Sequence, residues 1–181
     1  MKKIAGLLFV VCLVFVVIGC SSKPPVSEGG MPSKVASARR DAPEDVLVGI
    51  GNAKMSTLAQ SRNIAATRAR TEISQIMNSM VRNMVRDYTA SSEVDPQASL
   101  AFQENITVTL SQSNLSGAVI WYETSDNDGN WWVVMHLSKT SVAREISQAQ
   151  AAARLAVPAM ASFDAEARMN KAFDQAKSEG W

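Results

Sequence analysis

The chain has 181 residues, of which 46% are hydrophobic, and a formal net charge of +1. This length suits one domain with a substantial core rather than two. The near-neutral charge gives no electrostatic field strong enough to indicate nucleic acid or an acidic partner.

The N-terminus has the pattern of an export signal. Met1 to Lys3 is basic, residues 4–18 form an almost unbroken apolar run, and Cys20 follows the small residue Gly19. A run of ~15 apolar residues suits a signal-peptide core and is short for a membrane-spanning helix.

The stretch Val17-Ile18-Gly19-Cys20 resembles the lipobox of bacterial lipoproteins. This resemblance implies that the signal peptide, residues 1–19, is cleaved off. It also implies that Cys20 carries acyl chains such as palmitate, which hold the chain on a membrane. An ordinary secretory leader and a short uncleaved anchor are the alternatives.

Ser21 and the cysteine count extend this interpretation. An aspartate after the acylated cysteine is the usual retention signal for the inner membrane, so Ser21 favours the outer membrane, on its periplasmic or surface face. The only cysteines are Cys20 and Cys12, and Cys12 lies within the leader. An acylated mature chain therefore has no free thiol, which excludes a disulfide, a thiolate zinc site and cysteine catalysis.

Residues 20–43 are predicted to be a flexible tether. They contain Pro24, Pro25, Gly29 and Pro32 and offer few side chains to bury. A flexible segment of this size has an r.m.s. reach on the order of 25–30 Å. A folded N-terminal arm is the alternative, which the prolines and glycines disfavour.

The predicted domain, residues 44–157, begins with a buried strand at residues 46–51, where the side chains are aliphatic or β-branched. Gly49 and Gly51 invite comparison with nucleotide-binding loops. The third glycine of a dinucleotide loop is replaced by Lys54, and the Gly-Lys-Ser/Thr of a P-loop is absent. We therefore expect the glycines to let the following helix pack closely on the strand.

A long helix is predicted from Leu58 to near Tyr88. Thr57 and Gln60 fit a capping box, and no glycine or proline follows before Pro96. Apolar side chains recur along the helix at three- and four-residue spacing. They are Leu58, Ala65, Ala69, Ile73, Ile76, Met80, Met84 and Tyr88. Arg62 lies on the same stripe. We expect it either to extend past the sheet edge or to pair with a carboxylate or with backbone carbonyls there.

A second helix and a hairpin are predicted next. Asp95 is a candidate N-cap, and apolar residues at four-residue steps indicate a helix over residues 96–114, although residues 106–110 also alternate like a strand. Residues 118–122 and 131–137 flank a polar turn, the pattern of a β-hairpin. We expect one face of the second strand to meet the long helix. That face carries Trp131, Val133, Met135 and Leu137, and the opposite face carries Trp132 and Val134.

The C-terminal part is predicted to be helical, with a break at Pro158 and a separate helical tail over residues 158–181. The chain contains more apolar side chains than a core between the long helix and one sheet face needs. We therefore expect an interface shared between copies of the chain, because large apolar side chains are enriched at such surfaces. Its candidate residues are Trp132, Val134, Phe163, Met169 and Phe173. The alternative is that the tail folds back and covers the second sheet face within one chain.

Catalytic machinery is not predicted. His136 is the only histidine and lies within a predicted strand, so a metal site with two histidines is excluded. No Ser-His-Asp arrangement and no carboxylate pair stands out. We expect no catalytic residue, no cofactor, no metal and no small-molecule substrate. An enzyme or small-molecule binder is a minor alternative, which a deep pocket lined by Arg62, Arg70 and His136 would favour.

Four segments together resemble the LPP-twenty family of small bacterial lipoproteins. They are the lipobox, the strand Val48 to Ala53, the alanine-spaced helix Ala59 to Ala69 and the strand at residues 131–137. The resemblance covers about Val46 to Ile146. The family includes outer-membrane surface antigens and is similar to the flagellar lipoprotein FlgP and the N-terminal domain of FlgT. The resemblance implies a membrane-attached structural or assembly role, with no catalytic residues to carry over. It extends to flagellar outer-membrane structures, and no residue separates a flagellar member from a general envelope one.

The predicted class is α+β, a small three-stranded sheet packed by one long helix, in the order β-α-α-β-β-α(-α). The expected function is that of a lipid-anchored outer-membrane lipoprotein acting through contacts with envelope proteins, itself included. A lipoprotein that binds or regulates cell-wall machinery is the alternative.

Overall fold

The computed structural model of the protein describes residues 30–181 and confirms the predicted α+β class. The three antiparallel strands, in the sheet order β1-β3-β2, are β1 (Val46–Ala53), β2 (Val119–Ser125) and β3 (Trp131–Ser138). The helices are α2 (Ser33–Ala36), α3 (Leu58–Ala90), α4 (Pro96–Gln112), α5 (Lys139–Ala156), η2 (Pro158–Met160) and α6 (Ala165–Ser178). From β1 onward the elements follow the predicted order.

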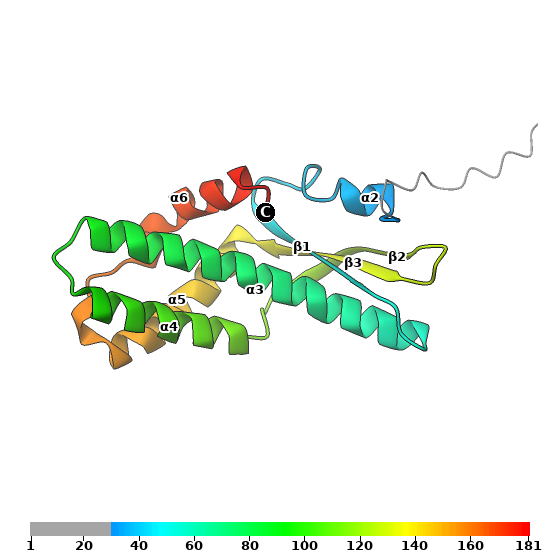
Figure 1. Cartoon of the computed structure of the whole chain (residues 1–181). Coiled ribbons are helices and arrows are strands. Elements are labelled where there is room, and N and C mark those ends of the chain that lie inside the picture. The colour runs from blue at the N-terminus through cyan, green and yellow to red at the C-terminus, as the bar shows by residue number, and fades with distance from the viewer. Residues whose placement is uncertain (1–29) are drawn as a thin grey trace, which may run out of the picture.

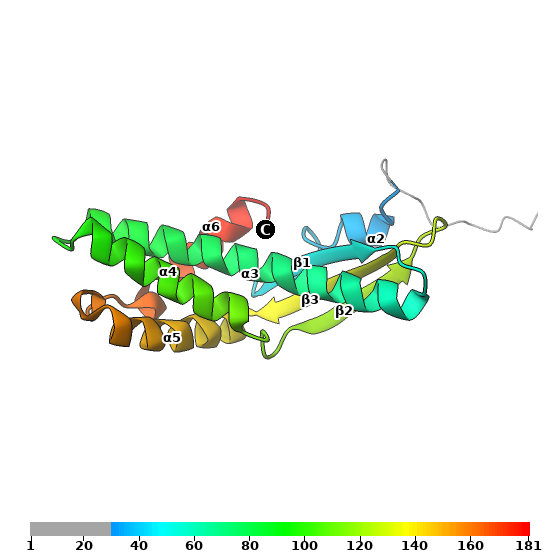
Figure 2. The same ribbon diagram turned by 60° about the horizontal axis from the view of Figure 1, so that its bottom comes forward.

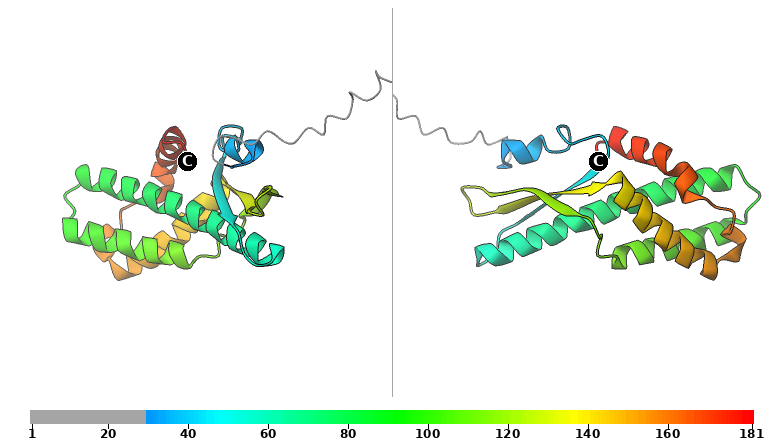
Figure 3. Two further views of the ribbon diagram at one scale, coloured as in Figure 1. Left: turned by 45° about the vertical axis from the view of Figure 1, so that its right-hand side comes forward. Right: turned by 180° about the vertical axis from the view of Figure 1, so that it is seen from behind.

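The long helix α3 joins the sheet to a helical layer. Its first half lies across one face of the sheet, and its second half continues beyond the sheet beside α4 and α6 (Figures 1 and 2). Figure 3 shows α5 leaving the end of β3 and running beside α4. A helix of this length spans about 50 Å at 1.5 Å per residue. The molecule is therefore elongated along α3.

Glycines in β1 bring α3 unusually close to the sheet. A methyl group added at Gly49 would lie 2.2 Å from the carbonyl oxygen of Ala69. One added at Gly51 would lie 2.0 Å from the carbonyl oxygen of Ala65. At neither position is there room for the Cβ atom that every other residue carries, so the predicted packing role of these glycines is confirmed.

The start of α3 follows the predicted cap, with one difference in exposure. The hydroxyl of Thr57 accepts a hydrogen bond from the backbone N–H of Gln60 at 3.2 Å. The predicted apolar stripe is buried from Ala65 to Met84, and Tyr88 is half-buried at its end. Leu58, however, is 62% exposed, unlike the buried part of the stripe.

The two faces of β3 belong to two separate cores, as its alternating pattern predicted. Val133, Met135 and Leu137 lie in the main core with the side chains of α3, α4, α5 and α6. Trp132 and Val134 lie on the opposite face, in a smaller cluster with Val48 of β1.

That smaller core corrects the predicted tether. Residues 30–43 are not a free linker, because Val35 of α2 and Ala38 are completely buried against Val48, Trp132 and Val134. Arg39 adds an ion pair with Glu72 of α3. Burial of these apolar side chains outweighs the disfavouring prolines and glycines, so a folded arm is correct for this part. Residues 20–29 of the predicted tether, like Cys20 and the signal peptide, lie outside the described residues.

The C-terminal tail shares the main core and is not a separate unit. Phe163 is completely buried, and its ring lies edge-on to Tyr88 at 5.4 Å and to Phe102 at 5.3 Å between centroids. The buried side chain of Gln150 fixes the connection after η2: it donates to the carbonyl of Phe163 at 3.0 Å and accepts from the N–H of Ala165 at 2.9 Å.

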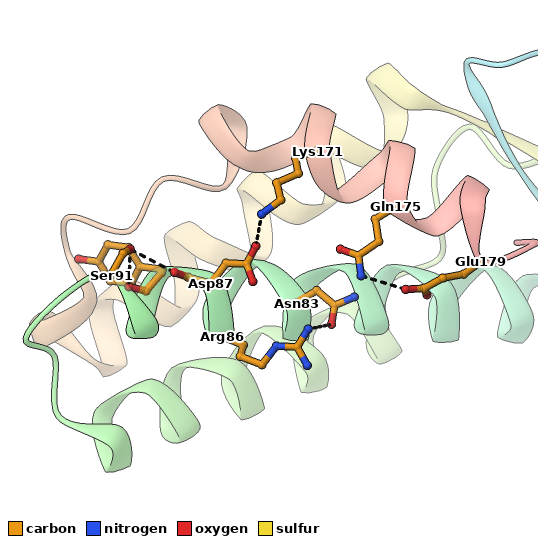
Figure 4. A network of polar contacts seen from close by, with 8 residues as sticks. Asn83, Arg86, Asp87, Ser91, Lys171, Gln175 and Glu179 are labelled. Atoms are coloured by element: carbon orange, nitrogen blue, oxygen red, sulfur yellow. Dashed lines mark hydrogen bonds and ion pairs between the residues drawn. The ribbon is translucent and has the colours of Figure 1, made fainter.

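Helix α6 is held on α3 by apolar and polar contacts. Met169 and Phe173 face inward, at 4% and 1% exposure. On the outside, the ammonium group of Lys171 lies 2.6 Å from the carboxylate of Asp87, and the side chain of Gln175 donates at 2.9 Å to Glu179, the C-cap residue of α6 (Figure 4).

The predicted interface between copies is therefore wrong as a surface. All five of its residues are buried within one chain: Trp132, Val134, Phe163, Met169 and Phe173. The expected alternative is wrong in part as well. The tail folds back, as that alternative required, but it covers α3 and α5, while the N-terminal arm covers the second sheet face.

Candidate functional site: the outer surface of strand β2

The two edge strands of the sheet, β1 and β2, differ in how many side chains hydrogen-bond to their backbone groups. Along β1, the carboxylate of Glu72 accepts the N–H of Ile50, and Arg68 donates to the carbonyl of Asn52. The ammonium group of Lys177 lies 3.5 Å from the carbonyl of Val46. Side chains from α3 and α6 therefore occupy part of the hydrogen-bonding edge of β1, a common protection against pairing with another chain.

Within residues 32–181, the only side chain that hydrogen-bonds to a backbone group of the edge strand β2 is that of its own Thr124. Three consecutive apolar side chains are exposed at its start: Val119 at 57%, Ile120 at 37% and Trp121 at 43%. Its single charged residue, Glu123, is engaged by Arg62. An edge strand with exposed apolar side chains and no unpaired charge is the kind of strand to which another strand adds.

A β-bulge shapes this strand at Trp121. The pairing register with β3 shifts between Ile120 and Tyr122, so Trp121 has no residue opposite it. Its ring stacks on the imidazole of His136, with 4.9 Å between centroids and 11° between planes. Lys34 of α2 places its ammonium 5.3 Å from the Trp121 ring and 4.4 Å from the Tyr122 ring. These contacts fix the tryptophan in one orientation while nearly half of it stays exposed.

His136 lies beneath this tryptophan and is only 7% exposed. Burial lowers the pKa of its imidazole, and the nearby positive charge of Lys177 lowers it further. Its Nε2 atom has no hydrogen-bond partner. The neutral imidazole therefore serves as a packing surface for Trp121 of β2. The sequence alone predicts that His136 is a strand residue facing solvent or a helix; its place in a strand is confirmed, but it is buried and its ring faces Trp121.

Arg62 forms a pair at the sheet edge, one of the two roles predicted for it. Its Nε donates to Glu123 Oε2 of β2 at 2.7 Å. The bond raises the pKa of Arg62 and lowers that of Glu123. Arg62 and His136 lie on opposite faces of the sheet, so they do not line one pocket.

Arg70 lies elsewhere, in a groove of about 230 Å³ between α3 and the end of α4. The groove is lined mainly by hydroxyl and amide groups, including Ser74, Ser113 and Asn78. The hydroxyl of Ser74 is directed to the carbonyl of Leu110, and that of Ser113 bonds the buried carboxylate of Glu145. The three residues that would have favoured an enzyme are thus not brought together.

Among residues 30–181, no group of three or more metal-ligating side chains lies together. No helix in the same part is long and apolar enough to cross a membrane. Sequence reasoning recognised residues 118–122 as a strand but did not identify Val119, Ile120 and Trp121 as a surface. Their exposure depends on β2 being an edge, which the strand pattern alone does not reveal.

Comparison of the chain with family models, with curated proteins and with solved structures finds no match.

Proposed function

We propose that the protein is a lipid-anchored lipoprotein of the bacterial outer membrane with a structural or assembly role, acting through contacts with other envelope proteins or with further copies of itself. The lipobox at Val17 to Cys20 supports the anchor. A place in a flagellar outer-membrane structure is the narrower form of this proposal, supported by the resemblance to the LPP-twenty family.

The contrast between the two sheet edges supports a role in contacts. Glu72, Arg68 and Lys177 occupy backbone groups of β1, whereas β2, the other edge strand, exposes Val119, Ile120 and Trp121. A partner strand beside β2 would gain main-chain hydrogen bonds and would cover these three side chains. The β-bulge interrupts the regular spacing of backbone groups in β2 at Trp121. A regular partner strand would therefore pair either with the residues before Trp121 or with those after it, and this restricts the register in which it can bind.

Photocrosslinking in cells tests both parts of the proposal. A photoreactive amino acid replaces Val119, and a matched control replaces Val108, a valine of α4 with nearly equal exposure, 53% against 57%. We expect defined crosslinked products from position 119, few from position 108, and outer-membrane fractionation of both. In a Cys20→Ala background the chain should appear as a soluble periplasmic protein or an uncleaved precursor.

Two results would contradict the proposal separately. Equal crosslinking from both positions would show that β2 is not a preferred contact surface. Unchanged outer-membrane fractionation of Cys20→Ala would show that acylation does not hold the chain there. The mass of a product from position 119 distinguishes a second copy from another envelope protein.

A further inference from the structure

One end of the molecule combines the exit of the N-terminal chain with exposed apolar side chains. The beginning of α2, the turn between β2 and β3 and the beginning of α3 all lie at this end, and Figures 1, 2 and 3 agree on their placement. The ends of α3 and α5 lie at the opposite end of the long axis. Met55 and Leu58, in and just after the β1–α3 connection, are 48% and 62% exposed. We call Met55 and Leu58 the apolar tip.

The apolar tip is an ordered turn. The N–H of Met55 donates to the hydroxyl of the buried Ser61 at 2.9 Å, and that hydroxyl donates to the carbonyl of Thr57 at 3.0 Å. Lys54 passes close to Gly129 of the β2–β3 turn, within 4 Å of where a side chain would begin there. The two apolar side chains are therefore presented by backbone that is fixed before any contact forms.

The folded N-terminal arm shortens the link to the membrane. Because α2 is packed on the sheet, only nine residues, 21–29, separate Cys20 from the first described residue. A chain of this length spans at most about 35 Å and has an r.m.s. reach of roughly 15–20 Å if flexible. An anchored domain is thus confined near the lipid, and the end that carries the apolar tip is the end where the link joins.

From this placement we infer that the apolar tip rests in the interfacial region of the lipid bilayer, as a second contact beside the acylated Cys20. The inference rests on the proposed lipid anchor. Met55 and Leu58 supply the apolar part, while the neighbouring Lys54 and Ser56 stay at the level of the headgroups. Two side chains bind a membrane weakly on their own. The short link, however, keeps their local concentration near the lipid in the millimolar range, so a weak contact is populated.

Site-specific fluorescence tests the inference on the acylated mature protein. The acylated chain has no free thiol, so Leu58→Cys introduces a single site for an environment-sensitive fluorophore. Leu155→Cys is the control, because Leu155 is also a helical leucine, is 86% exposed, and lies near the end of α5 at the opposite end of the molecule. Both proteins are placed in vesicles of phosphatidylethanolamine and phosphatidylglycerol, with and without brominated acyl chains.

We expect the probe at position 58 to shift to shorter emission wavelengths and to lose most of its emission to the brominated lipid. The emission of the probe at position 155 should remain as it is in water.

If both labelled proteins float with the vesicles and the emission of both probes remains as in water, the inference about the tip is overturned and the anchor stands. Equal quenching at both positions also overturns it, because the domain would then lie flat on the bilayer. Failure of the wild-type protein to float overturns the anchor and the inference together. Met55→Cys, on the same turn, should behave like Leu58→Cys.

Discussion

Replacing Gly51 with alanine measures how closely α3 lies on β1. The added methyl group would lie 2.0 Å from the carbonyl oxygen of Ala65 and 2.6 Å from the amide nitrogen of Ala69. Favourable contacts of carbon begin at about 3.5 Å, so helix and strand must separate by about 1.5 Å. Both obstacles are backbone atoms, which cannot rotate away as a flexible side chain could.

The expected loss of stability has two causes. One is the overpacking itself, and the other is the gap that opens along the buried stripe of α3 when the helix moves away from β1. We expect Gly51→Ala to lower the free energy of unfolding by about 3 kcal/mol, the upper part of the range for inserting a group into a packed core. For a domain of this size that corresponds to a fall in melting temperature of roughly 6–12 °C. Thermal and urea unfolding of the unacylated mature chain, carrying Cys20→Ser and followed by circular dichroism, would measure it.

The sign of the change makes this test decisive. Gly51 has an ordinary backbone conformation, and without a close neighbour alanine there would stabilise the protein by about 0.5–1 kcal/mol, because it restricts the unfolded chain. Gly180→Ala is the control: its φ is +87° but nothing lies within 4 Å, so only conformational strain of about 1 kcal/mol is expected. A Gly51→Ala protein at least as stable as the control would refute the close packing of α3 on β1.

Two further predictions concern the second sheet face. The pKa of His136 is lower in the folded protein than in the unfolded chain, so the unfolded chain binds more protons at mildly acidic pH. The free energy of unfolding should therefore fall as the pH drops below about 6.5, the ordinary pKa of histidine. The fall should be steepest between that value and the lower pKa of the folded state. His136→Gln should reduce this fall, measured as urea midpoints across that range; an unchanged pH dependence would assign it to other groups. Val35→Asp should release α2 by placing a charge in a fully buried position, and trypsin should then cut after Arg39 and Arg40 on the order of tenfold faster, with the rest of the domain protected. Cleavage at the wild-type rate would mean that α2 does not depend on Val35.

The elements predicted correctly from the sequence are those with strong periodicity or clear turn chemistry. The alternation from Trp131 to Leu137 assigned each side chain of β3 to its face, and Thr57 marked the start of α3. Gly49 and Gly51 indicated close packing because glycine has little other use inside a buried strand. These local rules need no knowledge of the remainder of the fold.

What escaped prediction depends on tertiary placement. The N-terminal arm is held by Val35 and Ala38, too few apolar residues to form a periodic pattern in a segment rich in proline and glycine. The sequence shows a surplus of apolar side chains, but it does not show which element covers each of them. Trp132 is covered by the N-terminal arm, and Phe173 by α3 and α5. The exposure of Trp121 follows from the strand order, since the same residue in a central strand would be covered.

The packed arm also determines where mechanical load on an anchored chain would be felt. A pull transmitted from Cys20 reaches Gly30 first and meets the contacts of Val35 and Ala38 before it reaches β1. Detaching the arm would free residues 30–45, about 50 Å of extended chain, while the pairing of β1 with β3 stayed intact. The small second core would thus act as an extensible element in series with the lipid, one that yields first and can refold once the force is removed.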